Sequence, residues 1–168
     1  MDVPQLDIEP FNNGSEQARA SVASELDRIC RDIGFVVLRG HGVSEDTQRA
    51  LYDDGLGFFD LPLERKLEIR RRHHERNRGY IPYGEERLVR MHGGDSPPDY
   101  KEVLAIGPCQ VPDTPYYRCA AAYPNFAPNL WPERPASLRA SMEAYYRAME
   151  RLSATVLQMA ALSRSIAR

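Results

Sequence analysis

The sequence predicts an α+β fold that is mainly helical and has a few short strands. Several segments repeat apolar side chains every three or four residues, which places them on one face of an α-helix. Short β-branched or aromatic runs lie between these segments and are bounded by glycine or proline. A length of 168 residues, with 42% hydrophobic and 27% charged content, fits one soluble domain with a modest core.

The first forty residues predict an extended opening, a helix and a buried strand. The opening covers residues 3–11, and Ser15 is a suitable N-cap for a helix over residues 15–33. That helix carries its apolar residues at helical spacing: Ala18, Val22, Leu26, Ile29 and Ile33. Gly34 interrupts the pattern, and the apolar run at residues 35–38 is typical of a buried strand.

Two further helices are expected before residue 73. Ser44 precedes two acidic residues, which suit a helix amino terminus, and this helix should run to about Phe59. Pro62 suits the first turn of a third helix that continues toward Arg72. The third helix would therefore end in a cluster of basic residues.

The second half of the chain predicts a loop-rich middle and a long final helix. Residues 92–135 hold nine of the thirteen prolines, so they should be mostly irregular, with one extended piece at residues 100–106. Residues 135–166 are strongly helical. Their apolar stripe alternates steps of four and three over three heptads: Leu138, Met142, Tyr145, Met149, Leu152, Val156 and Met159.

Composition excludes several classes of function. The three cysteines form no CxxC pair and their number is odd, which favours a reducing cytoplasm over a disulfide framework. The acidic start lacks leader features, and no stretch approaches about eighteen apolar residues, so neither export nor a membrane span is expected. Residues 65–78 carry a local charge of +5, but they lack interleaved aromatics, and nucleic-acid binding is not predicted.

Six blocks of sequence, in chain order from Val3 to about Ala161, resemble one known family. The blocks are VPQLDIEPF, ELDRICRDIGFVVLRGHGV, FFDLPLERKLEI, RGYIPYGEE, DYKEVLAIG and NLWPERPASLRASMEAYYRAMERL. Together they resemble the amino-terminal domain of the isopenicillin N synthase-like oxygenases, many of which use 2-oxoglutarate. Leu104 departs slightly, because an aromatic residue is common at that position in the family.

The resemblance implies a non-haem oxygenase in its complete form, one that hydroxylates, desaturates or cyclises a small molecule. In the family, a His-x-Asp/Glu pair and a distant histidine hold Fe(II) on a jelly roll, or double-stranded β-helix. Three ligands on one face leave three positions for 2-oxoglutarate or substrate and O2. Those strands follow the long helix in the family, so we expect residues 1–168 to lack the jelly roll, any catalytic residue and turnover on their own.

An iron site built from this chain's own histidines is the alternative. His73 and Glu75 satisfy the His-x-acid spacing, and His92 offers a third ligand. Five nearby arginines would repel a dication, so a solvated basic helix end is the preferred interpretation and no metal ligand is predicted. His41 lies between two glycines, where a tight turn and ring-to-backbone hydrogen bonds are expected instead.

The resemblance also implies which residues contact substrate, because in the family these segments approach the mouth of the active site. The residues are Arg78, Tyr80, Tyr83, Lys101 and Glu102. Tyrosine offers a rigid ring with one hydroxyl, and the charged side chains would orient a polar substrate. The alternative is structural: the tyrosines pack the domain, and Lys101 and Glu102 form a surface ion pair of little energetic value.

A second class of function rests on the helix predicted at residues 135–166. A strict four-three stripe is also what a coiled-coil seam requires. Leaving its large side chains in water would cost roughly 1.5 to 3 kcal/mol each. The alternative hypothesis is therefore an interaction module without catalysis, which self-associates or binds a separate jelly-roll chain through this helix.

Overall fold

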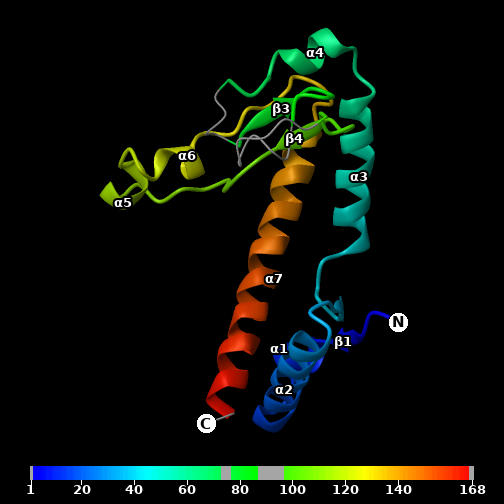
Figure 1. Cartoon of the computed structure of the whole chain (residues 1–168), viewed down its shortest axis with the longest axis vertical. Helices are drawn as coiled ribbons and strands as arrows, with labels where there is room; N and C mark the ends of the chain where they lie inside the picture. Colours follow the sequence, from blue (N-terminus) through cyan, green and yellow to red (C-terminus); the bar gives the residue numbers. More distant parts are fainter. Residues whose placement is uncertain (1, 73–76, 87–96, 167–168) are drawn as a thin grey trace. The chain divides into compact units, whose positions relative to one another are not determined.

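The computed structural model describes residues 2–72, 77–86 and 97–166 and divides the chain into two compact units (Figure 1). Unit 1 comprises Met1–Gln48 and Arg147–Arg168, and unit 2 comprises Arg49–Tyr146. The elements in chain order are β1 Gln5–Asp7, α1 Glu9–Asn13, α2 Glu16–Asp32, β2 Val37–Arg39, α3 Glu45–Phe59, α4 Leu63–Leu67, β3 Gly79–Ile81, β4 Val103–Ala105, α5 Pro115–Arg118, α6 Tyr123–Phe126 and α7 Leu138–Ile166.

Unit 1 is built around a small apolar core. The strands β1 and β2 pair in parallel, with Leu6 opposite Leu38. The fully buried side chains of the core come from β1, α1, α2 and α7 and the residues beside them: Ile8, Phe11, Ala23, Ile29 and Met159. The opening is not extended throughout, because α1 begins at Glu9 and has Pro10 in its first turn, where the fixed φ of proline suits a helix.

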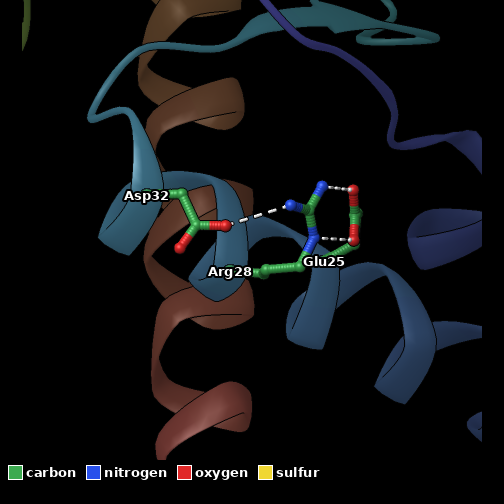
Figure 2. A network of polar contacts seen from close by, with 3 residues as sticks. All are labelled: Glu25, Arg28 and Asp32. Atoms are coloured by element: carbon green, nitrogen blue, oxygen red, sulfur yellow. Dashed lines mark hydrogen bonds and ion pairs between the residues drawn. The ribbon is translucent and has the colours of Figure 1, made fainter.

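The helix α2 matches its expected start and places charged residues outward. The Ser15 hydroxyl accepts a hydrogen bond from the Ala18 N–H at 3.3 Å, so the predicted N-cap is confirmed. Figure 2 shows Arg28 between Glu25 and Asp32 on the exposed face; its Nε lies 2.9 Å from Glu25, and its Nη1 lies 3.1 Å from Asp32. Ion pairs this exposed contribute little to stability.

The strand predicted at residues 35–38 is confirmed at residues 37 and 38, but its side chains are exposed or only partly buried, so the predicted burial is wrong. The strand β2 covers Val37–Arg39, and the side chains of Phe35 and Val37 are 73% and 47% exposed. Within the described residues β2 pairs only with β1, so one of its edges has no neighbouring strand. Gly40 and Gly42 adopt positive φ around His41, whose Nδ1 accepts the Val43 N–H at 3.1 Å, as the turn prediction required.

Unit 2 packs helices against the antiparallel pair β3 and β4, in which Tyr80 lies opposite Leu104. Its core contains Phe58, Ile69, Tyr80 and Leu138. The predicted third helix is too long, because α4 ends at Leu67 and does not continue toward Arg72. Tyr80 donates its N–H to the Ile69 carbonyl and accepts the Arg71 N–H, both at 2.8 Å. This pairing with a distant strand uses backbone groups that would otherwise form the next turn of the helix after Leu67.

The helix α7 confirms the long helix expected near residues 135–166. Its apolar stripe contributes to the core of each unit: Leu138 and Met142 in unit 2, and Leu152, Val156 and Met159 in unit 1. Among the large apolar side chains of α7 whose burial the structure describes, up to residue 163, Leu157 is the exposed one, at 70%. The stripe is thus mainly core.

The fold class is confirmed in its coarse form. The described residues are mainly helical, with short strands in two two-stranded sheets and no closed barrel. Two short helices, α5 and α6, lie within the proline-rich region that was expected to be irregular. Among the helices that the structure describes, none combines the length and the apolar character needed to cross a membrane.

Candidate functional site

The strands β3 and β4 bring two of the expected substrate-contacting residues together. Tyr80 is 1% exposed, and its hydroxyl donates a short hydrogen bond to Glu102 Oε2. The same oxygen lies 2.8 Å from the Lys66 ammonium of α4. Lys66 also donates to the Phe59 carbonyl at 2.9 Å and lies 5.5 Å from the centre of the Tyr80 ring. Three segments of the chain therefore meet at one carboxylate.

The protonation of this cluster, which comprises Lys66, Tyr80 and Glu102, follows from its burial and hydrogen bonds. Burial acts to raise the pKa of Glu102, but hydrogen bonds from Lys66 and Tyr80 outweigh it and leave the pKa below its usual value. Burial raises the pKa of Tyr80, and the hydrogen bond to Glu102 adds to the shift. At neutral pH Glu102 is therefore a carboxylate and Tyr80 a neutral phenol.

The lowered pKa of Glu102 makes part of the chain's stability depend on pH. A lowered pKa in the folded state gives stabilisation that is present above the usual glutamate value of 4.5 and is lost as pH falls through the folded value. We expect Glu102→Gln to cost about 2 kcal/mol at neutral pH, since it leaves the Lys66 ammonium without its anion. Urea unfolding should show that the difference in free energy of unfolding between the original protein and Glu102→Gln becomes smaller in acid. An equal difference at neutral and acidic pH would contradict the lowered pKa of Glu102.

Arg78 lies apart from this cluster and is 7% exposed. Its guanidinium donates to three backbone carbonyls: Asn77 at 2.7 Å, Ala127 at 3.2 Å and Asn125 through a shorter contact. It also covers Gly107, where an added Cβ would collide with it. Desolvation lowers the pKa of Arg78 from its usual value. The guanidinium therefore fastens the segments around residues 107 and 125–127 to β3.

Tyr83 and Lys101 are the expected site residues that face solvent. Tyr83 is 62% exposed and pairs with Tyr100, which is 79% exposed, at a ring-centre distance of 6.0 Å. Lys101 pairs with Glu86 at 3.0 Å and with Asp99 at 3.2 Å. The alternative, a surface ion pair between Lys101 and Glu102, is therefore wrong, because Glu102 pairs with Lys66 instead.

Lys66 is the member of the cluster that sequence reasoning missed. It was grouped with the solvated basic run at residues 65–78. On α4, however, the charged side chain is buried and the apolar ones are exposed. Lys66 is 8% exposed, whereas Leu63 and Leu67 are 53% and 36% exposed. A five-residue helix has no periodicity that could reveal this. The Glu102 carboxylate and the Phe59 carbonyl, which both accept from its ammonium, explain the burial.

The described residues do not gather a metal site. Across residues 2–72, 77–86 and 97–166, no group of three or more His, Cys, Asp or Glu side chains has a suitable arrangement for a metal ion. The alternative ligands His73, Glu75 and His92, with His74, lie outside these described ranges. His41 uses Nδ1 to accept a backbone hydrogen bond.

Comparisons with known proteins agree with the fold. A family described as "non-haem dioxygenase in morphine synthesis N-terminal" matches residues 3–134. A 2-oxoglutarate-Fe(II) type oxidoreductase of Aspergillus fumigatus is 36% identical over 164 residues, which cover 95% of this chain and 47% of that protein. Validamycin A dioxygenase of Streptomyces hygroscopicus subsp. limoneus is 31% identical over 161 residues. The aligned region is 95% of this chain and 42% of that protein.

A solved structure extends the comparison. The crystal structure of a full-length Neurospora crassa protein in complex with alpha-KG matches with a TM-score of 0.74 and 25% identity, over 96% of this chain and 46% of that one. The chain therefore spans about half the length of the curated relatives it matches. With residues 3–134 inside the family match, the chain belongs to the non-haem dioxygenase N-terminal family of the isopenicillin N synthase-like, 2-oxoglutarate- and Fe(II)-dependent oxygenases.

Proposed function

We propose that this chain is the amino-terminal domain of a non-haem Fe(II)/2-oxoglutarate-dependent dioxygenase that oxidises a small molecule in the cytoplasm. The observation that carries the proposal is the match over 95% of the chain to a 2-oxoglutarate-Fe(II) type oxidoreductase at 36% identity. The aligned region is 47% of that relative. We further propose that residues 1–168 do not turn over alone and act with a second, catalytic half.

The described residues do not fit the iron that the family implies. They supply no suitable group of three metal ligands. The Arg78 guanidinium could suit a carboxylate cosubstrate, but it already donates hydrogen bonds to backbone carbonyls. The contribution proposed for this chain is therefore the shape and polarity of the substrate pocket. Tyr83, Lys101 and Glu102 have exposed atoms for direct contacts, and Arg78 and Tyr80 hold their segments in place.

The helix-mediated interaction module stays an alternative proposal. Self-association, or binding to a separate jelly-roll chain, would use α7. Most of the α7 stripe already packs within the two cores, and Leu157 is the large apolar side chain that is exposed among residues 138–163 of this helix. Sedimentation of the purified chain tests this alternative, because a monomer at high concentration is expected if α7 is a core helix.

The proposed function is tested by measuring succinate formed from 2-oxoglutarate with Fe(II) and ascorbate. We expect background succinate from residues 1–168 alone. We expect turnover when the chain is joined to the half of the Aspergillus fumigatus relative that it does not match. That half alone is the control for activity independent of this chain. Many turnovers by residues 1–168 alone would overturn the proposed dependence on a second half.

A further inference from the structure

In the cluster of Lys66, Tyr80 and Glu102, the Glu102 carboxylate has one oxygen that no described donor contacts. Glu102 Oε2 accepts from both the Lys66 ammonium, at 2.8 Å, and the Tyr80 hydroxyl. Within residues 2–72, 77–86 and 97–166, no donor bonds to Glu102 Oε1. The Glu102 side chain is 27% exposed, whereas that of Lys66 is 10% exposed. The Glu102 side chain is therefore anchored from the protein interior and partly exposed to solvent.

Two fixed donors on one oxygen restrict how the carboxylate can turn. Lys66 is itself held by the Phe59 carbonyl at 2.9 Å, and the Tyr80 ring is fixed in the core against Phe58 at a ring-centre distance of 5.8 Å. A group held in this way loses little conformational entropy when a ligand binds, which favours recognition. A surface glutamate without such anchors would have to be ordered by the ligand.

We infer that Lys66 and Tyr80 are positioning residues for Glu102, whose Oε1 accepts a hydrogen bond from a neutral donor group of the substrate, an amide N–H or a hydroxyl. This inference rests on the proposed function. The charge of the pair favours a neutral donor. Lys66 and Glu102 together are neutral, so a second cation at Oε1 would meet the Lys66 ammonium, which lies 2.8 Å from the other oxygen of the same carboxylate. A neutral donor meets no such repulsion.

The test follows the carboxyl carbon of Glu102 by NMR in the 168-residue chain labelled with carbon-13 at glutamate carboxyl groups. The probe is benzamide, which has amide N–H donors, and the matched control is methyl benzoate, which has the same ring and no donor. We expect a saturable shift of the Glu102 signal with benzamide and none with methyl benzoate. No response to benzamide, or equal responses to both compounds, would overturn the inference.

Variants separate positioning from packing. Lys66→Met keeps the apolar stem and removes the anchor, so we expect benzamide binding to weaken about fivefold or more, the size of one neutral hydrogen bond. Lys66→Arg restores a cation and should recover binding. If Lys66→Met fails to fold, Tyr80→Phe, which removes only the second anchor, decides the question. Unchanged binding in a folded Lys66→Met, or in Tyr80→Phe when that variant decides, contradicts the role. Succinate formation by the joined protein does not depend on these results, so the two proposals fail separately.

Discussion

Replacing Phe58 with alanine is expected to lower the free energy of unfolding of unit 2 by about 3–5 kcal/mol. Phe58 is 0% exposed and makes edge contacts with the rings of Phe59 at 5.3 Å and Tyr80 at 5.8 Å. Alanine would remove most of this buried surface and leave a cavity among Ile69 and Leu138, which fixed helix and strand backbones cannot fill completely. Chemical denaturation followed by far-ultraviolet circular dichroism measures the loss.

The matched control for Phe58→Ala is Phe35→Ala. Phe35 is the same residue type but is 73% exposed, so its loss should change the free energy of unfolding by less than about 0.5 kcal/mol. Equal losses for the two variants would show that Phe58 does not lie in a packed core. Because Glu102 bonds to Tyr80, Phe58→Ala should also disturb the carboxyl NMR signal of Glu102.

Replacing Arg78 with methionine is expected to cost about 3 kcal/mol of stability. Methionine keeps a long apolar side chain but leaves the carbonyls of Asn77, Asn125 and Ala127 without their donor. Unpaired polar groups in a buried setting lose their hydration without compensation. Arg78→Lys should recover only part of the loss, because one ammonium cannot reproduce the planar fork of a guanidinium. Urea unfolding of the three proteins measures these differences.

Arg28→Met is the control for Arg78→Met, since Arg28 makes several hydrogen bonds but stays exposed (Figure 2). Its effect on the free energy of unfolding should be much smaller than that of Arg78→Met, because exposed ion pairs contribute little. Gly107→Ala provides an independent check, because the new methyl group would push the Arg78 guanidinium from its position. A fully stable Gly107→Ala protein would contradict the placement of Arg78.

The elements that the sequence predicted well are those determined by local signals. Ser15 caps α2, the positive φ of two glycines turns the chain around His41, and the four-three stripe runs along α7. Each of these signals acts within a few residues or along one helix. Their physical causes are therefore present in any short window of the sequence.

The elements that the sequence predicted badly depend on distant partners. The helix α4 ends at Leu67, and Ile69 and Arg71 then pair with Tyr80 of a later strand. Lys66 is buried beside Glu102, 36 residues away, whose carboxylate accepts its hydrogen bond and balances its charge. Propensity cannot anticipate such pairings. The possible ligands around His73 and His92 lie outside the described residues, so that prediction stays untested.

The substrate-contacting set was only partly brought together. Tyr80 and Glu102 are joined by a hydrogen bond, whereas Arg78 donates to backbone carbonyls. Lys101 forms ion pairs with Glu86 and Asp99. The family resemblance identified these segments but could not assign a task to each side chain. Those tasks depend on burial, which separates the fully buried Tyr80 from the exposed Tyr83.

Succinate formation from 2-oxoglutarate, measured for residues 1–168 alone and for the same residues joined to a relative's unmatched half, tests the central claim most directly. We predict background succinate from the isolated chain and many turnovers from the joined protein. Sustained succinate formation by the isolated chain would contradict this prediction, since the chain would then hold iron and complete the reaction without a second half.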